Sequence, residues 1–399
     1  MMVSRRSIAH RLVFLFPGAA PLLWKRLPDN LPKIKTSSLS GMGGSATDGR
    51  KFSIRVSLHR MPKSQRPVRI AIGPINNLPP CQLKNAMEAV ARQFAKDQNV
   101  LVVRNGWFSY RWTQIFDQGV TPSHAEVAKA RPDSDRADQQ FAPVPVEEVC
   151  AQIRAERPNL VVAPHVETSA GMLLPDHYLQ ALTTAAHEVG ALFVLDCVAA
   201  GALWANMDAL GIDVLITAPQ KGWTSTPCAG VVMLSQRALD RLETTTSDSF
   251  ALDLNKWHNI MGSYLGGGHA YHATLPTDGL AGFYDTYQEM AGIGFDALKT
   301  RQIELGRQVR ELTEGYGFKS LAADGFQSPT VVVSHTDRSD FKNGSAFASV
   351  GLQIAAGVPL ECGESAEFQT FRLGLFGIDK LMHIDRTVSL LDDALKQLV

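Results

Sequence analysis

The chain has 399 residues, of which 45% are hydrophobic and 20% are charged, as in a globular protein rather than a disordered one. No apolar run approaches the roughly 18 residues of a membrane-spanning helix. The 39 basic residues equal the 39 acidic ones, and a net charge of zero argues against a dedicated nucleic-acid-binding protein. The five cysteines are scattered, so we expect no disulfide framework, no structural zinc, and a reducing, cytoplasmic location.

The zero net charge hides an uneven distribution. Residues 1–87 carry 15 Lys or Arg against two acids, a net of +13, while residues 88–399 carry 24 against 37, a net of −13. Residues 36–85 also show neither a helical nor a strand period. We expect residues 1–85 to be an atypical basic segment, either disordered or not native to the domain behind it, as a shifted reading frame would produce. The arginines and the apolar stretch between residues 4 and 24 also allow a targeting peptide.

Helices and strands are expected to alternate from residue 86 to about residue 235. Helical spacing of apolar residues marks 86–95, 146–156 and 174–190, and short apolar runs predict strands at 99–104, 159–164, 191–196, 213–218 and 230–235. Each predicted strand is apolar throughout, which is typical of a sheet that is covered on both faces. The pattern predicts the α/β class, with a mostly parallel sheet sandwiched by helices.

The pattern changes after about residue 245. A glycine-rich turn at 266–268 and a long helical region at about 278–315 precede two predicted strands and a closing amphipathic helix, at 330–334, about 368–374 and 380–398. We expect a smaller C-terminal α+β domain here. The predicted organisation is a basic segment (1–85), a large domain (86–285) and a small domain (286–399).

Polar residues follow three predicted strands, at the edge where open parallel sheets bind ligands. Thr168 follows the first, Asp196 ends the second, and Gln220 and Lys221 follow the third. Pyridoxal phosphate requires a lysine amine that bonds to it and a carboxylate that keeps its pyridine nitrogen protonated. Lys221 and Asp196 fit these roles, the Thr168 hydroxyl fits the phenolic oxygen, and Gln220 is placed to orient the site. The structural alternatives are a helix-capping Asp196 and a solvated Lys221.

At this point the sequence resembles the class-V, fold-type-I aminotransferases, near the alanine–glyoxylate and serine–glyoxylate (serine–pyruvate) enzymes. The resemblance runs from about Ala86 to Val399 and rests on the stretches HVETSAG, VLDCVAAG, DVLITAPQKGW and FRLGLFG. It implies transfer of an amino group from an alanine- or serine-like donor to a 2-oxo acid such as glyoxylate or pyruvate. It also implies that Lys221 forms the Schiff base and shuttles the proton, and that Asp196 lies at the pyridinium.

The resemblance implies further roles. Phe108, two residues after Asn-Gly, would stack on the cofactor ring, with Trp107 as a substitute. Arg372 would bind the substrate α-carboxylate with its guanidinium fork, and the alternative is a surface ion pair. Tyr271 and Thr274 would bond the cofactor phosphate of a neighbouring subunit, which implies a homodimer with shared sites. The alternative for this stretch is simple packing at an interface.

The sequence departs from the family at the phosphate cup. That turn aligns with Gln82-Leu83-Lys84-Asn85, which lacks both the glycine and the hydroxyl of the family. Lys84 remains as a source of positive charge, and the family's N-terminal Pro-Gly-Pro segment is not recognisable. The chain is therefore either an active aminotransferase or a degenerate relative with impaired cofactor binding.

A third interpretation keeps the cofactor and changes the chemistry. Cysteine desulfurases and related lyases share this fold and use a mobile cysteine as the nucleophile. Cys362 lies ten residues before Arg372, within reach of the predicted site. The alternative for Cys362 is an ordinary buried thiol.

Overall fold

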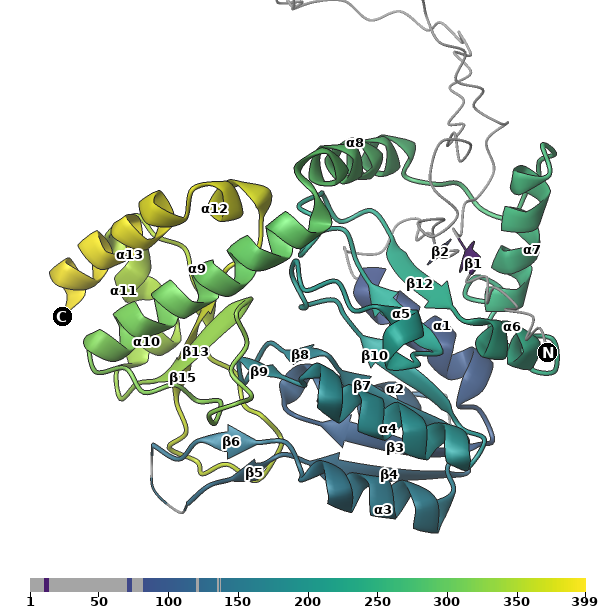
Figure 1. The fold of residues 1–399 in the computed structure, drawn as a ribbon, viewed down its shortest axis with the longest axis horizontal. Helices are drawn as coiled ribbons and strands as arrows, with labels where there is room; N and C mark the ends of the chain where they lie inside the picture. Colours follow the sequence, from purple (N-terminus) through teal and green to yellow (C-terminus); the bar gives the residue numbers. More distant parts are fainter. Residues whose placement is uncertain (1–10, 14–69, 74–81, 120–121, 135, 137) are drawn as a thin grey trace, which may run out of the picture.

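The computed structural model describes residues 11–13, 70–73, 82–119, 122–134, 136 and 138–399. Most predictions for residues 1–85, including the targeting peptide, lie outside these residues. The described chain forms a large lobe around an eight-stranded sheet and a smaller lobe around a three-stranded sheet (Figure 1). The predicted α/β class and the mostly parallel sheet are confirmed.

The large sheet has the order β1-β12-β11-β10-β7-β3-β4, with β2 also pairing with β12. The strands β11, β10, β7, β3 and β4 are parallel to one another, and β12 runs antiparallel to β11. The bounds are β1 (Arg11–Val13), β2 (Ile70–Gly73), β3 (Asn99–Arg104), β4 (His124–Lys129), β7 (Leu160–Pro164), β10 (Leu192–Asp196), β11 (Val214–Thr217) and β12 (Gly230–Leu234). All five strands predicted in this half of the chain are present.

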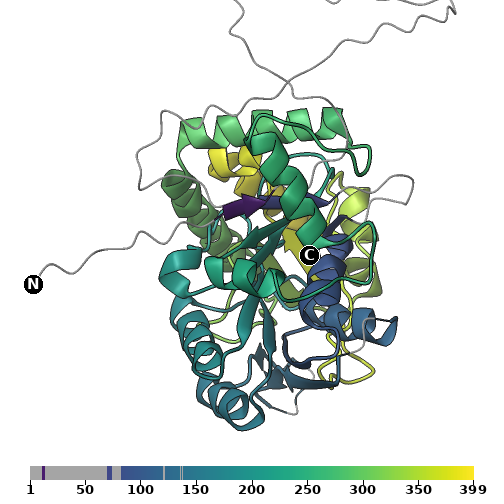
Figure 2. The same ribbon diagram turned by 90° about the vertical axis from the view of Figure 1, so that its right-hand side faces the viewer.

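Helices cover both faces of the large sheet, as Figure 2 shows. Alternate residues of one strand face opposite sides, so Val100 and Val102 pack with α1 and α2 while Leu101 and Val103 pack with α3 and α4. The first face carries α1 (Gln82–Phe94), α2 (Trp107–Asp117), α6 (Gln236–Leu242) and α7 (Leu254–Leu265), and the second carries α3 (Val146–Glu156), α4 (Asp176–Glu188) and α5 (Met207–Leu210). The strands are therefore buried on both faces, which explains their continuous apolar runs.

Two long helices lead from the large lobe to the small one. They are α8 (Thr277–Ile293) and α9 (Phe295–Gly315), and they replace the single helical region predicted for 278–315. The chain breaks at Gly294, whose φ of 98° lies in the left-handed region that glycine favours. Phe283 in α8 belongs to the large-lobe core and Met290 to the small-lobe core. The predicted boundary at residue 285 falls within this helix and stays a prediction.

The small lobe has an antiparallel sheet of order β13-β15-β14. Its core joins side chains of α9 and α13 to phenylalanines of α10, α11 and β15. The bounds are β13 (Val331–His335), α10 (Ser339–Lys342), α11 (Ser345–Ser349), β14 (Ala355–Ala356), β15 (Thr370–Gly374), α12 (Ile378–Met382) and α13 (Ile384–Leu398). Two small hairpins, β5 (Arg131–Pro132) with β6 (Phe141–Ala142) and β8 (Val166–Glu167) with β9 (Met172–Leu173), lie in the large lobe.

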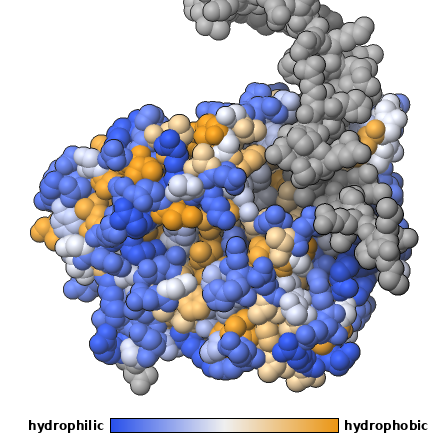
Figure 3. Space-filling view, viewed as in Figure 1, coloured by the Kyte–Doolittle hydropathy of each residue, from blue (hydrophilic) through white to orange (hydrophobic). Residues whose placement is uncertain are grey.

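The face of the described chain in Figure 3 is mainly hydrophilic, with apolar patches scattered over it. In the described part of the chain no helix is long and apolar enough to cross a bilayer. Nor do the described His, Cys, Asp and Glu side chains form a group of three that would hold a metal ion.

Asp213, directly before β11, links the neighbouring chain segments of β10 and β12 through its carboxylate. Its carboxylate accepts hydrogen bonds from the Phe193 backbone N–H (2.9 Å) and the Ser235 hydroxyl (3.0 Å), and it pairs with His187 and Arg237. Asp213→Ala leaves the buried Phe193 N–H without its partner, so we expect the free energy of unfolding, measured in urea, to fall by about 1–3 kcal/mol. The exposed Asp240→Ala is the matched control and should change the unfolding free energy by less than about 0.5 kcal/mol. Equal effects of the two variants would contradict this role for Asp213.

Candidate active site

The carboxyl ends of three neighbouring parallel strands meet at one edge of the large sheet. In the register of the sheet, Asp196 in β10 lies opposite Pro164 in β7 and Ile216 in β11. Backbone bonds continue past the strand ends, since the His165 N–H donates to the Asp196 carbonyl at 2.8 Å. The loops that carry Thr168, Asp196 and Lys221 therefore leave the sheet side by side.

Asp196 is 9% exposed, and one carboxylate oxygen accepts a hydrogen bond from the Val198 backbone N–H at 2.9 Å. The pKa of this carboxyl is raised to about 6, mainly by burial and also by the charge of Glu167, while the Val198 hydrogen bond and the charge of Arg111 oppose the shift. Asp196 is therefore a buried acid at the strand end, held by its own loop, near charges of both signs.

Lys221 is half-buried in the turn after β11. Its ammonium nitrogen lies 5.1 Å from the centre of the Phe376 ring, and burial, followed by the charges of Arg372 and Arg111, lowers the pKa of its amine. The turn has little space, because a Cβ on Gly222 would come within 2.2 Å of the Gly201 carbonyl oxygen. A lysine with a lowered pKa more readily provides the neutral amine that a nucleophile or general base needs.

Arg372 reaches the site from the small lobe. It lies in the middle of β15, is 8% exposed, and donates from Nε to the Ala356 carbonyl at 2.7 Å. Its guanidinium carbon is 5.4 Å from the centre of the Phe108 ring. Burial lowers the pKa of this group and the charge of Glu167 opposes that shift. Arg372 is thus a buried cation at the junction of the lobes rather than a surface side chain.

Phe108 and Trp107 begin α2, which starts directly after the Asn105-Gly106 turn at the end of β3. Two guanidinium groups contact the Phe108 ring. The guanidinium carbon of Arg111 lies 4.6 Å from the ring centre and that of Arg372 lies 5.4 Å from it. The sequence did not single out Arg111. Arg111 lies three residues after Phe108 on the same helix, and residues at i and i+3 share one face, so this spacing could have indicated that Arg111 lies beside Phe108.

The sequence also missed the role of Glu167, which lies inside one of the recognised stretches. Its side chain is fully buried, and its two oxygens accept hydrogen bonds from the backbone N–H groups of Phe108 (3.2 Å) and Ser109 (2.9 Å). Asn105 was missed as well: it is 1% exposed, and neither its Nδ2 nor its Oδ1 has a hydrogen-bond partner. No local pattern marks either contact, because the partners lie far apart in sequence.

The remaining predicted residues are half-buried or exposed in the single chain. Tyr271 is 75% exposed, Thr274 is exposed, and Lys84 is exposed in the first turn of α1. That helix begins at Gln82 rather than at Ala86, so the stretch aligned with the phosphate cup is helical. Thr168 is half-buried between Glu167 and Ser169. The roles predicted for these side chains stay predictions.

Cys362 is buried, with its sulfur 3.6 Å from the Arg104 carbonyl oxygen. Burial, reinforced by Glu167 and Glu364, raises the pKa of this thiol to about 12. A thiol with such a pKa is protonated near neutral pH and is a poor nucleophile.

The residues at the sheet edge fit pyridoxal phosphate. Gln220 has a buried side-chain oxygen without a hydrogen-bond partner, directly before the half-buried Lys221. Asp196 is a buried carboxyl at the neighbouring strand end, and Arg372 adds a buried cation from the other lobe. An amine of lowered pKa, a buried carboxyl and unmatched polar and cationic groups are the donor set that this cofactor and an anionic substrate require.

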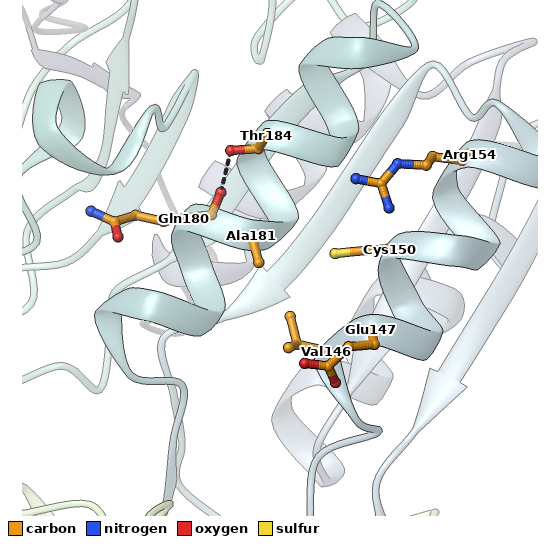
Figure 4. Close-up of a pocket in the computed structure, with 7 residues that line it drawn as sticks. All are labelled: Val146, Glu147, Cys150, Arg154, Gln180, Ala181 and Thr184. Carbon is orange, nitrogen blue, oxygen red and sulfur yellow. Dashed lines mark hydrogen bonds between the residues drawn. The ribbon is translucent and has the colours of Figure 1, made fainter.

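A groove elsewhere on the large lobe contains none of these residues. It lies between α3 and α4 (Figure 4) and is lined by Val146, Glu147, Cys150, Arg154, Gln180, Ala181 and Thr184. Arg154 pairs with Glu188 at 2.7 Å, and burial raises the pKa of Cys150. The groove is therefore not part of the candidate active site.

Comparison with known proteins agrees with this geometry. The Aminotransferase class-V family model matches residues 81–342. A 2-aminoethylphosphonate–pyruvate transaminase from Burkholderia ambifaria is 30% identical over 76% of this chain and 77% of its own length. An L-aspartate–glyoxylate aminotransferase from Paracoccus denitrificans is 24% identical over 59% of this chain and 56% of its own. The chain belongs to the class-V aminotransferase family.

Solved structures show the same fold. An alanine–glyoxylate aminotransferase from Nostoc sp. has a TM-score of 0.65 and 21% identity, covering 82% of this chain and 81% of its own. A pyridoxamine–pyruvate aminotransferase from Mesorhizobium loti has a TM-score of 0.66 and 16% identity, covering 82% and 79%. The chain thus has the fold-type-I architecture, and the predicted aminotransferase class is confirmed.

Gly106 provides a test of the turn that begins α2. A Cβ at this position would lie 2.1 Å from the Ser169 hydroxyl oxygen and 2.8 Å from Cγ of Glu167. We expect Gly106→Ala to lower the unfolding free energy by about 1–3 kcal/mol through overpacking. Gly282→Ala in α8 is the control: a Cβ there has no neighbour within 4 Å, and alanine favours a helix interior by up to about 1 kcal/mol. Urea unfolding curves that place both variants at or above the wild type would contradict the expected clash.

Proposed function

We propose that the chain transfers an amino group from an alanine- or serine-like donor to a 2-oxo acid such as glyoxylate or pyruvate, with pyridoxal phosphate as the cofactor. The observation that carries the proposal is the convergence of Lys221, Asp196 and Arg372, three buried or half-buried charged groups from two lobes. Arg372 lowers the pKa of Lys221, and the charge of Arg111 acts on the pKa of all three groups, which supports a shared site. The named pyruvate and glyoxylate transaminases among the relatives support this substrate class.

The cofactor, when bound, supplies a protonated pyridine ring that accepts the electrons released from the substrate α-carbon. The Asp196 carboxylate holds the proton on the pyridine nitrogen by its opposite charge. Lys221 would hold the cofactor through its amine; once the amino donor has displaced that amine, the freed amine, with its lowered pKa, would take and return the α-proton. Arg372 binds the α-carboxylate with its planar fork, which fixes the α-carbon relative to Lys221.

Further residues complete the proposed cofactor site. The Thr168 hydroxyl would bond the phenolic oxygen, Gln220 would orient the site with its side-chain amide, and the Phe108 ring would pack against the cofactor. Lys84 adds positive charge at the start of α1, near the helix N-terminus that favours a phosphate. The desulfurase alternative has less support, because the Cys362 thiol is buried and has a strongly raised pKa.

The covalent role of Lys221 is directly testable. Wild-type protein mixed with pyridoxal phosphate should show a visible absorbance band, and borohydride should fix the cofactor to the peptide that contains Lys221, as measured by mass spectrometry. Lys221→Ala should lose both signals, because no other amine occupies that position. The exposed Lys396→Ala serves as the control and should keep both. Wild-type protein that neither develops the band nor retains cofactor in dialysis would instead be the degenerate relative.

The carboxylate role of Arg372 predicts a kinetic signature. Arg372→Lys keeps the positive charge and removes the bidentate fork. We expect KM for the amino donor to rise about tenfold to a hundredfold, the equivalent of about 1.5–3 kcal/mol for a hydrogen bond to a charged group. Steady-state kinetics measure this, and the visible band should remain. An unchanged KM would show that another group binds the carboxylate.

We also propose a homodimer in which Tyr271 and Thr274 complete the site of the partner subunit. The exposure of both side chains in the single chain supports this, since a residue that serves a neighbouring subunit points away from its own. Phe250 and Leu265, 82% and 52% exposed, add apolar area to the same part of the chain.

The described cysteines are free and buried, which supports a reducing, cytoplasmic location for the enzyme.

Complementation between inactive variants tests the shared site. Lys221→Ala and Tyr271→Ala should each have low activity when produced alone. Co-expression gives mixed dimers in which one site combines the intact Lys221 of one subunit with the intact Tyr271 of the other, so activity should reappear. Co-expression of Lys221→Ala with Asp196→Ala is the control, because each substitution disables the site of the subunit that carries it. Its mixed dimers contain no intact site. A lack of recovery in the first pair would place Tyr271 in the site of its own subunit.

A further inference from the structure

Glu167 is a buried charged group to which the proposed chemistry gives no task. The residue is 0% exposed. No Lys, Arg or His of the described chain forms an ion pair with it. A carboxylate in such a place must be satisfied by hydrogen bonds, because burying an unpaired charge is costly.

Hydrogen bonds from two segments satisfy this carboxylate. Oε1 accepts from the Phe108 N–H (3.2 Å), the Ser169 N–H (3.0 Å) and the Ser169 hydroxyl (2.7 Å). Oε2 accepts from the N–H and the hydroxyl of Ser109 at 2.9 and 2.7 Å. The Ser169 hydroxyl in turn accepts from the Trp107 N–H at 2.9 Å. Glu167 and its neighbour Ser169 therefore receive the free N–H groups of the first turn of α2.

This arrangement fixes the aromatic residue at the start of α2. The N-terminus of the 11-residue helix α2 carries a partial positive charge, which favours a carboxylate at that end. The bond from the Phe108 N–H sets the backbone position of the residue whose ring contacts the guanidinium groups of Arg111 and Arg372. Glu167 thus fixes the backbone of Phe108, whose ring lies against the guanidinium group of Arg372.

The charge of Glu167 also acts across the site. It raises the pKa of Asp196 and opposes the lowering of the pKa of Arg372. The charged or titratable groups around Asp196 are Glu167 on β8, Arg111 on α2 and its neighbour Cys197. Among them, Glu167 carries a negative charge directly before Thr168, a proposed cofactor contact.

We propose that Glu167 is a positioning residue of the active site. Its carboxylate fixes the start of α2, so that Phe108 and Arg372 keep the geometry that aligns the substrate carboxylate. This inference rests on the proposed aminotransferase function and extends it to a residue that touches neither substrate nor cofactor.

The test compares Glu167→Gln with Ser169→Ala. Glu167→Gln keeps the shape and removes the charge and part of the acceptor set, while Ser169→Ala weakens the same hydrogen-bond network and leaves the carboxylate in place. We expect Glu167→Gln to raise KM for the amino donor at least about tenfold, because Arg372 loses its alignment. Ser169→Ala should raise KM less while lowering the urea midpoint.

A second readout does not depend on turnover. Tryptophan fluorescence can measure the binding of pyridoxal phosphate to the cofactor-free protein across pH. Binding should weaken as the pH falls through the pKa of Asp196, about 6, because only the ionised carboxylate holds the pyridine proton. Glu167 raises that pKa, so in Glu167→Gln the decline should occur at lower pH. In Ser169→Ala, which keeps the charge, the decline should stay at the wild-type pH.

The outcomes separate the two proposals. Wild-type protein without cofactor binding or transaminase activity contradicts the proposed function itself. Active wild-type protein with Glu167→Gln matching Ser169→Ala in KM and in the pH of the decline overturns the positioning role alone. If Glu167→Gln does not fold, Ser109→Ala removes one hydroxyl donor to the same carboxylate. A KM raised in Ser109→Ala supports the proposal, and a KM equal to that of the wild type overturns it.

Discussion

The alignment of strand ends in the parallel sheet is the constraint on which the site depends. The strands β7, β10 and β11 are hydrogen-bonded in a register that puts Pro164, Asp196 and Ile216 in one row. Neighbouring loops that leave such a row begin one strand spacing apart. A carboxyl, a hydroxyl-bearing loop and a lysine from distant parts of the sequence are thereby brought together. The helices on both faces serve to bury the strands that hold this row.

The second lobe supplies a buried cation, Arg372, which we propose binds the substrate carboxylate. Arg372 lies in the central strand of a three-stranded sheet, so its backbone is held on both sides. The two lobes are joined beside Lys221, where the Thr224 hydroxyl accepts a hydrogen bond from the Ile378 N–H at 3.1 Å. Trp223 adds aromatic contacts with Trp204 and Phe295 at the same junction. The turn that carries Lys221 is therefore packed against the small lobe that carries Arg372.

The sequence was sufficient for five strands of the large sheet and for the positions of the residues at their ends, because these follow from local patterns and from one rule about parallel sheets; it did not indicate β1, β2 or β4. It was insufficient where a contact joins distant segments. Glu167 receives N–H groups from residues 58 and 59 positions away, and nothing near it in the sequence indicates them. The helix break at Gly294 depends on a backbone conformation, and the start of α1 at Gln82 follows a segment of unusual composition. Tertiary contacts decide such features.

The altered start of α1 has a consequence for cofactor binding in the proposed dimer. A glycine cup would bring backbone N–H groups close to the phosphate, whereas here the corresponding stretch is helical and carries the exposed Lys84. An exposed lysine provides a screened charge and little geometric constraint. The remaining proposed phosphate contacts, Tyr271 and Thr274, come from the partner subunit. Cofactor affinity in this chain should therefore depend on dimerisation more strongly than in a relative with an intact cup, and dilution that separates the subunits should release the cofactor.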